Sequence, residues 1–403
     1  MGATREDVDR AYREAFGRAV AVLARALRDL DLAEEAVQEA FAVALVRWPA
    51  DGLPDDPTAW ILRVARNRAI DVLRRRRMGA EREVLAVALE QPPPAEDEPS
   101  PVPDERLELL FACAHPALAV EARLPLVLRL VAGLTVPEIA RALLVPEPTV
   151  AQRLVRAKRR VRETGMPLGT PPAHLLPERL DGVLAAIYLL FNEGYAATAG
   201  DDAIRGELCD EAIRLARLVV ATMPDEAEAA GLLGLLLATD ARRDARLDAA
   251  GRYVPLEHHD RGRYRRARLG EADALVRRAL AAGAGPYALQ GAIAMVHSAA
   301  PAFAETDWPQ IVALYDALLA RTPSPVVALN RALAVGWVEG PDAALALVDA
   351  LAIELDAFAP LHAARGDLLL RLGRRAEAHR ALVRALALTT NPAEREHLAG
   401  LLA

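Results

Sequence analysis

Apolar side chains recur every three to four positions through most of the chain, which is the spacing of helices that bury one face. The first run predicts an amphipathic helix over Arg5–Leu30. Asp31 then has the place of an N-cap, and Glu34 and Glu35 follow it in a first turn, where the helix dipole favours negative charge. The apolar face of the first helix comprises Val8, Tyr12, Ala15, Phe16, Val20 and Leu23.

A third helix, Pro57–Arg77, is predicted after the turn-rich loop Pro49–Pro57. It has an apolar face, one aromatic residue at Trp60 and four consecutive arginines at its end. Such a helix indicates attraction to phosphate, although any solvated cationic helix has the same pattern. Prolines and acids without apolar periodicity follow at Gln91–Pro103, and we interpret them as a linker.

A compact helical unit is predicted over Asp104–Arg162. Thr135 has the place of an N-cap before a short helix, and Pro146 blocks its continuation, so that a new helix begins at Thr149. A short helix, a tight turn and a polar, basic second helix fit the major groove of DNA. The expected helices are Leu107–Ala114, Val120–Leu130, Val136–Leu143 and Thr149–Arg162, and the last of them turns Val150, Leu154, Ala157 and Val161 to the core.

Only helices are expected beyond the proline-rich connector Met166–Pro177. In Leu361–Ala387 small residues fall at the positions where the two helices of a tetratricopeptide unit cross closely, and Pro325–Leu351 is a degenerate copy. These small residues are Gly366, Gly373, Ala378 and Ala385, and the copy has Gly340 at the turn between its helices and Ala344 after it. The other expected helices are Leu180–Phe191, Glu207–Val220, Asp225–Thr239, Asp260–Ala282, Pro286–Ser298 and Trp308–Arg321.

Composition favours helices, since hydrophobic residues make up 53% of the 403 residues while aromatic residues make up 4%. No apolar run reaches the length of a membrane span, and the charged N-terminus has no signal-peptide core. The two distant cysteines, Cys113 and Cys209, suit a reducing cytoplasm. We find no motif of an enzyme or of a bound cofactor or metal, and we interpret His258–Asp260 and Asn192–Tyr195 as structural.

The net charge of −7 argues at first against nucleic acid, but its distribution changes that reading. Residues 1–165 hold 25 Lys and Arg against 26 Asp and Glu, whereas the remainder holds 24 against 30. Basic charge is concentrated in two helices, and such local clusters govern phosphate contact more than the total charge does.

Two constellations carry a family resemblance. The acidic run Asp31–Phe41, with Trp60 and the basic run Arg63–Arg77, resembles region 2 of the extracytoplasmic-function class of bacterial RNA polymerase sigma factors. Leu134–Arg162 is similar to sigma region 4. The downstream sequence looks like the subgroup with a long C-terminal tetratricopeptide-like extension. The resemblance implies core RNA polymerase and promoter DNA as partners, and a further protein or intramolecular contact of the extension.

The predicted architecture is all-α. It comprises region 2 in residues 1–80, a linker in 81–103, region 4 in 104–165, a connector in 166–177 and an all-helical, tetratricopeptide-like extension in 178–403, whose repeat is strongest over 325–390. We expect an RNA polymerase sigma factor that acts in the cytoplasm. Two alternatives are a helical scaffold with accessory DNA binding and a helix-turn-helix regulator that acts without polymerase.

The resemblance assigns three sets of binding residues. The set expected to contact core polymerase is Asp31, Glu34, Glu35, Gln38, Glu39 and Phe41. The set expected to contact the minus-ten promoter element is Trp60, Arg63, Arg66, Asn67, Arg68, Arg74, Arg75, Arg76 and Arg77, although Trp60 fits a core residue better. The helix-turn-helix set for the minus-thirty-five element is Thr149, Gln152, Arg153, Arg156, Lys158, Arg159 and Arg160.

Overall fold

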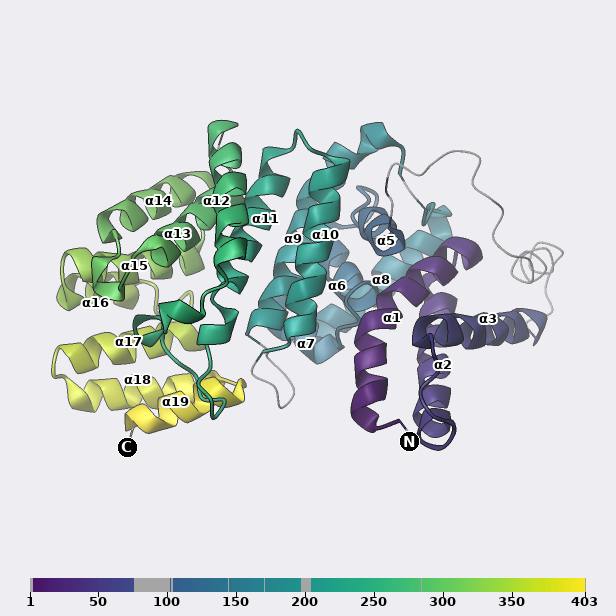
Figure 1. The fold of residues 1–403 in the computed structure, drawn as a ribbon, viewed down its shortest axis with the longest axis horizontal. Helices are drawn as coiled ribbons and strands as arrows, with labels where there is room; N and C mark the ends of the chain where they lie inside the picture. The colour runs from purple at the N-terminus through teal and green to yellow at the C-terminus, as the bar shows by residue number, and fades with distance from the viewer. Residues whose placement is uncertain are drawn as a thin grey trace. The chain divides into compact units, whose positions relative to one another are not determined.

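The computed structural model describes residues 3–75, 102, 104–143, 145–169, 171–196, 204–283 and 285–402. The described chain is all-α and divides into two compact units, Met1–Leu190 and Phe191–Ala403 (Figure 1). One isolated β-bridge joins Leu247 and Tyr253. None of the described helices is long and apolar enough to cross a lipid bilayer.

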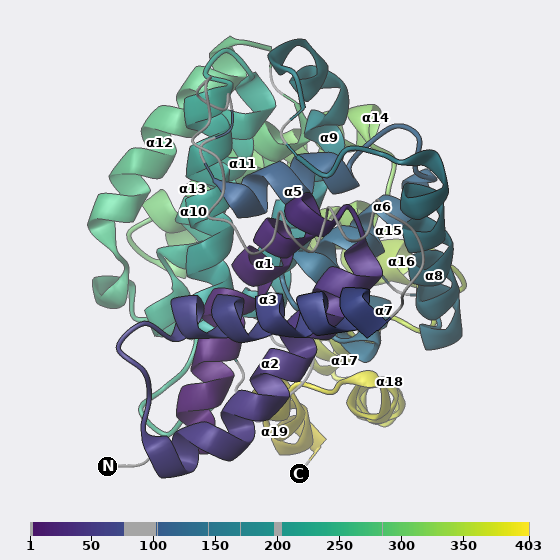
Figure 2. The same ribbon diagram turned by 90° about the vertical axis from the view of Figure 1, so that its right-hand side faces the viewer.

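Helices α1 (Arg5–Leu27), α2 (Leu30–Asp51) and α3 (Pro57–Arg75) begin the first unit. All three pack against one another, and α3 lies across the other two in Figure 2. Trp48 of α2 and Phe16 of α1 are among their largest fully buried side chains. The expected basic helix is present, and its last two residues, Arg76 and Arg77, lie outside the described residues, as does most of the predicted linker.

Local geometry corrects two sequence predictions at α2. The first helix ends at Leu27 because Arg28 adopts a left-handed conformation, with φ of 52°. Asp29, not Asp31, is the N-cap, since its carboxylate accepts from the backbone N–H groups of Asp31 and Leu32 at 3.0 and 3.1 Å. The helix also runs past Pro49 to Asp51, so the loop is shorter than expected. A proline in the last turn costs only one intrahelical bond, which explains its tolerance there.

Helices α5 (Glu105–Cys113), α6 (Val120–Leu130), α7 (Val136–Leu143) and α8 (Glu147–Thr164) follow in the same unit. The predicted bounds of α6 and α7 are confirmed. Thr135 and Glu138 form a capping box at α7, in which the Glu138 carboxylate accepts from the Thr135 N–H at 2.6 Å. The predicted core residues of α8, Val150, Leu154, Ala157 and Val161, are all buried.

Helix α9 (Leu176–Tyr195) contains the division between the units, and its residues up to Leu190 belong to the first unit. There the Arg179 side chain donates to the carbonyl oxygen of Phe111 in α5 at 3.1 Å. Gly182 lets the helix approach closely, because a Cβ atom at that position would lie 3.3 Å from the Cβ atom of Ala114. The start of α9 is therefore part of the core around α5.

The second unit is a series of antiparallel helical pairs. Its helices are α10 (Gly206–Thr222), α11 (Ala227–Asp240), α12 (Arg266–Ala281), α13 (Pro286–Ala299), α14 (Trp308–Arg321), α15 (Pro325–Val338), α16 (Pro341–Ala350), α17 (Ala359–Arg371), α18 (Arg375–Leu388) and α19 (Pro392–Leu402). The helix expected from Asp260 begins only at Arg266, after a segment with three short 3₁₀ turns.

Small residues set the crossings of the last helical pairs. A Cβ atom at Gly366 of α17 would lie 2.6 Å from the Leu382 side chain of α18, and one at Gly336 of α15 would lie 2.9 Å from Ala344 of α16. Gly340 and Gly373 occupy the turns with φ of 100° and 74°, which glycine adopts without strain. Gly366 thus lies at a close crossing, as the sequence pattern predicts, whereas Gly373 lies in a turn and the close approach at Gly336 was not predicted.

Candidate nucleic-acid interface

One buried ion cluster joins α2 to α6 and α8. The Glu34 carboxylate, only 7% exposed, accepts from Arg129 Nε at 2.6 Å and from Lys158 Nζ at 2.5 Å. One turn earlier, Asp31 pairs with the same Lys158 at 3.1 Å and with Arg162 at 3.3 Å. We call these five residues the Glu34 cluster.

The Glu34 cluster is electrostatically well matched. Burial alone lowers the pKa of the Lys158 ammonium, but the Glu34 and Asp31 carboxylates outweigh it and hold that pKa above its usual value. Nearby, burial raises the pKa of the Tyr12 hydroxyl to about 12, against the opposing charge of Arg129. The Lys158 and Tyr12 side chains therefore keep their ordinary charge at neutral pH.

The other residues expected to contact polymerase are divided between the surface and the core. Glu35 and Gln38 are exposed on α2, and Gln38 also donates to Glu34 at 2.9 Å. Phe41 is only 4% exposed and packs edge-on against Tyr12, with ring centroids 4.9 Å apart. Its side chain thus supports α2 from the core and is not on the surface, where a direct contact would need it.

Sequence analysis missed an apolar extension of this exposed face of α2. Leu45 and Val46 are 48% and 76% exposed, two to three turns beyond Glu35 and Gln38 on the helix. Large apolar side chains at helical spacing beside polar ones are typical of protein-binding surfaces. The sequence could have indicated this surface, because Leu45 and Val46 fall outside the helical repeat of buried residues that contains Phe41, Ala44 and Trp48.

The arginines of helix α3 are partly exposed and partly packed beside its core. Trp60 is half-buried and packs edge-on against Trp48, with centroids 5.3 Å apart. Arg63 and Asn67 are exposed one turn apart, and Arg74 and Arg75 are exposed at the end of the helix. Arg66 and Arg68 are half-buried, as Trp60 is, and Arg68 pairs with Glu39 of α2 at 2.5 Å.

Helices α7 and α8 form the helix-turn-helix. Gln152 and Arg156 are exposed one turn apart on α8, and Thr149 and Arg153 are half-buried beside them. Arg159 and Arg160 are exposed near the end of the helix, where Arg159 pairs with Glu163 at 2.6 Å. Lys158 is the exception, since only 16% of its side chain is exposed and both of its carboxylate partners lie on α2.

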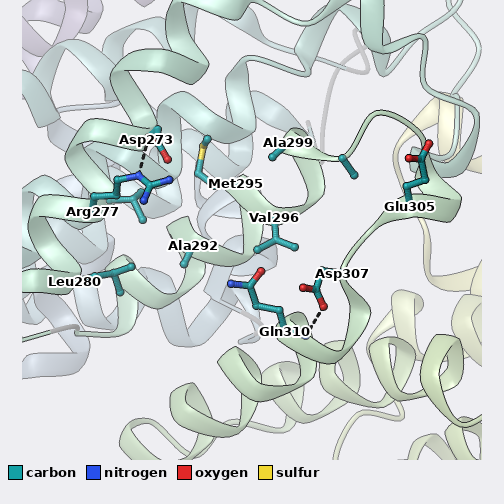
Figure 3. Close-up of a pocket in the computed structure, with 12 residues that line it drawn as sticks. Asp273, Arg277, Leu280, Ala292, Met295, Val296, Ala299, Glu305, Asp307 and Gln310 are labelled. Carbon is teal, nitrogen blue, oxygen red and sulfur yellow. Dashed lines mark hydrogen bonds and ion pairs between the residues drawn. The ribbon is translucent and has the colours of Figure 1, made fainter.

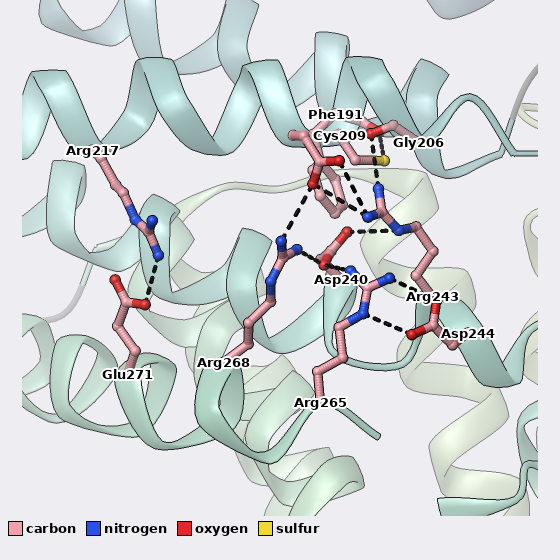
Figure 4. Close-up of polar contacts among 11 residues, drawn as sticks. Phe191, Gly206, Cys209, Arg217, Asp240, Arg243, Asp244, Arg265, Arg268 and Glu271 are labelled. Carbon is pink, nitrogen blue, oxygen red and sulfur yellow. Dashed lines mark hydrogen bonds and ion pairs between the residues drawn. The ribbon is translucent and has the colours of Figure 1, made fainter. Parts of the chain in front are cut away.

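The second unit carries its own arginine–carboxylate network (Figure 4). Asp240, which is fully buried, pairs with Arg243 at 3.3 Å, with Arg265 at 3.0 Å and with Arg268. Arg265 also pairs with Asp244 at 2.6 Å. The network fixes the segment after α11 to the start of α12, which is a structural role.

A cavity of about 450 Å³ lies between α12, α13 and α14 (Figure 3). Its walls are apolar at Ala292, Met295 and Val296, and its rim carries Glu305 and Asp307. Asp307 is engaged as the N-cap of α14, accepting from the Gln310 N–H at 3.0 Å. Among the described residues no group of His, Cys, Asp and Glu side chains is arranged to hold a metal ion.

The two polar motifs that sequence analysis set aside have structural surroundings. The His259 ring lies within hydrogen-bonding distance of the Val254 carbonyl oxygen and the Tyr264 hydroxyl, at 3.1 and 3.3 Å, and burial lowers its pKa to about 4. Gly194, near the end of α9, lies against Cys209, since a Cβ atom there would be 2.7 Å from its backbone nitrogen. Neither place gathers the groups of a reactive site.

A three-helix unit with a basic helix, followed by a helix-turn-helix with its own basic helix, defines a DNA-binding protein of the transcription machinery. Comparison with known families agrees with this class. Residues 11–78 match Sigma-70 region 2, residues 108–161 match Sigma-70, region 4, and residues 179–280 match a family of unknown function, DUF6596.

One relative is similar over nearly the whole chain. An uncharacterized protein of Rhizobium meliloti (strain 1021) is 44% identical over 401 residues, which is 97% of this chain and 94% of the relative. The chain belongs to the sigma-70 family, with the role of an RNA polymerase sigma factor, and sigma factors are not enzymes. Core RNA polymerase and promoter DNA are the partners that these domains imply.

Proposed function

We propose that this chain is an extracytoplasmic-function sigma factor that directs cytoplasmic core RNA polymerase to promoters with two recognised elements. The exposed face of α2 contacts polymerase, the arginine face of α3 reads the minus-ten element, and α8 reads the minus-thirty-five element. The observation that carries the proposal is the joint presence, in one chain, of an exposed acidic and apolar face on α2 and two separate arginine-bearing helices.

The proposed DNA-binding residues form two groups, those that contact bases and those that contact phosphates. Gln152 and Arg156 are exposed, with the half-buried Arg153 beside them, near the start and middle of α8, the part of a recognition helix that meets base edges. Arginine and glutamine make bidentate bonds to guanine and adenine, each worth about 1–3 kcal/mol of discrimination. Arg159 and Arg160, nearer the end of the helix, suit phosphates, as do Arg74 and Arg75 of α3.

The extension, in this proposal, is a tetratricopeptide-like domain that regulates the activity of the sigma regions or contacts a partner. Its support is the pair of close crossings at Gly336 with Ala344 and at Gly366 with Leu382. Arrays of such hairpins present extended surfaces to peptides and helices. Removing the chain after Leu190 keeps the contacts of Arg179 and Gly182 with α5 and tests the role. A gain of transcription indicates inhibition by the extension, and a loss indicates that it is required.

Reconstitution with core polymerase tests the proposed function. The full chain is expected to co-purify with core polymerase and to give promoter-directed run-off transcripts. Leu45→Asp should abolish both by placing a charge on the apolar part of the α2 face, whereas Leu401→Asp, an exposed leucine in α19, is the matched control. DNA binding without polymerase would favour a helix-turn-helix regulator. Neither transcription nor DNA binding would favour a scaffold.

A further inference from the structure

We infer that the second unit binds duplex DNA through a surface of its own, in which four arginines contact backbone phosphates. They are Arg242, Arg261, Arg263 and Arg266, which we call the Arg261 patch. The proposed function places DNA contacts in α3 and α8 alone, so this surface is an addition to it. The patch lies in a basic stretch of an acidic region. Residues 240–268 hold nine arginines against five Asp and Glu residues, whereas residues 166–403 hold 24 Lys and Arg against 30 Asp and Glu.

The other five arginines of this stretch have acidic partners. They are Arg243, Arg265 and Arg268 in the network of Figure 4, with Arg246, which pairs with Glu394, and Arg252, which pairs with Asp248. By contrast, none of the four patch arginines forms an ion pair within the described chain. The Nε atom of Arg242 and the Nη2 atom of Arg261 also lack a hydrogen-bond partner there. The positive charge of the patch is therefore available to an anion.

The two segments that carry the patch lie beside each other, although about twenty residues separate them in the sequence. The 3₁₀ turn Arg243–Ala245, which follows Arg242, contacts the 3₁₀ turn Arg261–Arg263. From the start of α12, Arg266 Nη2 donates to the carbonyl oxygen of Arg261 at 3.4 Å. Arg263 and Arg266 are exposed, and Arg242 and Arg261 are half-buried. The four cations thus form one surface with two members open to solvent.

Neutral acceptors hold two of these guanidinium groups in place. Arg261 Nη1 donates to the carbonyl oxygens of His297 and Ala300 at 2.6 and 2.8 Å. Arg263 Nη1 donates to the carbonyl oxygen of Leu247 at 3.0 Å. Carbonyl oxygens carry no net charge, so these bonds position the side chains and leave their positive charge uncancelled. Side chains that are already positioned lose less conformational entropy when they bind a ligand.

Two histidines beside the patch experience this charge. Burial lowers the pKa of His297 to about 3, and the positive charges of Arg242 and Arg261 add to the effect. Burial and the same two arginines contribute to the pKa of His259, which falls to about 4. The potential around the patch is therefore positive, which favours an anion there.

Arg266 has an electrostatically unfavourable place in the fold. It is the first residue of α12, which has no acidic residue in its first turn and no side-chain N-cap. The N-terminus of a helix carries partial positive charge, so a cation there lowers stability. The same helix terminus attracts phosphate. A cation that opposes folding and has no acidic partner indicates a role in binding an anion and not in the fold.

Duplex DNA is the anion that fits this surface best. The planar guanidinium group matches phosphate oxygens with two parallel hydrogen bonds, and several such groups side by side suit the repeated phosphates of a DNA backbone. Promoter DNA is the polyanion that region 4 implies for this chain, and the second unit follows region 4 directly in the sequence. Contacts to phosphates carry no sequence information, so the patch adds affinity without changing promoter choice.

The patch predicts a specific change in the salt dependence of DNA binding. Each phosphate contact contributes about 0.9 to the slope of the logarithm of the binding constant against the logarithm of salt concentration. The double variant Arg263→Ser with Arg266→Ser should therefore reduce the slope by about 1.8. Fluorescence anisotropy of the full chain with a labelled short duplex of arbitrary sequence, across a salt series, measures it. The lysine double variant at the same positions keeps both charges and should keep the slope.

A matched control removes the same charge elsewhere on the unit. Arg217→Ser with Arg277→Ser changes two exposed arginines that pair with Glu271 and Asp273 at 2.6 and 2.8 Å, the first of which Figure 4 shows. This control should keep the wild-type slope. Arg266→Ser alone should weaken DNA binding while its unfolding midpoint stays equal to that of the wild type or rises, because a cation leaves the start of α12. A merely structural arginine would give a lower midpoint and an unchanged slope.

The inference is overturned if the slope of the patch double variant equals that of the wild type, or if the control double variant loses as much. It is also overturned if inorganic phosphate raises the unfolding midpoint of the wild type and not of the patch variant while the DNA slope stays unchanged, because the patch then binds a free phosphate. These measurements need no polymerase. A chain that supports no promoter-directed transcription but shows the expected change of slope would refute the proposed function and leave the DNA-binding patch in place.

Discussion

The Nε atom of Arg68 in α3 lies 2.5 Å from Oε2 of Glu39 in α2. The pair joins a residue expected to contact promoter DNA to one expected to contact polymerase. Its side chains are 42% and 38% exposed, and ion pairs at such sites stabilise proteins by about 0.2–1 kcal/mol. A phosphate or a polymerase cation can therefore replace either partner at small cost, which leaves both residues available for binding.

This geometry predicts different effects for the two members of the pair. Glu39→Gln should lower the free energy of unfolding by less than about 1 kcal/mol, because the pair is exposed. Arg68→Ala should weaken promoter binding by the holoenzyme, since the proposed function assigns this arginine to the minus-ten element. Denaturant unfolding and promoter-binding titrations measure the two effects. Arg47→Ala, an exposed arginine near the end of α2, is the control, and equal loss of promoter binding in it would refute the assignment of Arg68.

Arg153 and Arg160 of α8 are expected to differ in the kind of DNA contact they make. Arg153→Ala should relax the choice between promoters that differ in the minus-thirty-five element, with a loss of about 1–3 kcal/mol of discrimination. Arg160→Ala should weaken binding to all promoters alike and reduce the salt slope by about one. Run-off transcription on promoter variants across a salt series checks both. Unchanged promoter preference in Arg153→Ala would contradict base reading by this residue.

Sequence periodicity predicted the helix-turn-helix closely because its signals are local. Thr135 and Glu138 cap α7, Pro146 ends the turn, and the buried series of α8 follows the helical repeat. The same reasoning placed the cap of α2 at Asp31, two positions after the aspartate that caps the helix, Asp29. Cap geometry depends on backbone angles at Arg28, which the pattern of side chains does not specify.

The ion pairs between distant segments could not be predicted in this way. Glu34 and Lys158 each have an acceptable place on an exposed helix face, and nothing in either helix alone indicates that they meet. The start of α12 could not be predicted for the same reason. Arg265 pairs with Asp240 and Asp244, which lie earlier in the chain, and the helix begins only after it. Both features depend on ion pairs between residues far apart in the sequence, whereas hydrophobic periodicity reports only local structure.

Asp240 should be a major determinant of the stability of the second unit. Its fully buried carboxylate pairs with the arginines at 243, 265 and 268, and removing one member of a buried ionic group typically costs about 3–5 kcal/mol. Asp240→Asn is therefore expected to destabilise the unit by that order. Asp273→Asn is the control, since its pair with Arg277 is exposed and local, and should cost less than about 0.5 kcal/mol. Denaturant unfolding followed by circular dichroism distinguishes the variants, and equal midpoints would argue against the network.

The lowered pKa of the buried His297 predicts that the second unit loses stability on mild acidification. Burial, with the nearby positive charges of Arg242 and Arg261, lowers the pKa of His297 to about 3, whereas the unfolded chain has the ordinary pKa of about 6.5. Below pH 6.5 the unfolded chain binds a proton that the folded unit does not, so stability falls as pH decreases toward 3. The loss approaches about 1.4 kcal/mol per pH unit.

His297→Phe should flatten this dependence between pH 7 and pH 5. The substitution keeps an aromatic ring against Trp308, whose ring lies edge-on to His297 at 5.2 Å, and the Nδ1 atom that it removes has no hydrogen-bond partner in the described chain. His379→Phe, at an exposed position of α18, is the control and should leave the slope unchanged. Denaturant unfolding at pH 7, 6 and 5 measures the slope for each protein. A slope in His297→Phe equal to that of the wild type would assign the acid sensitivity to other groups, such as His259.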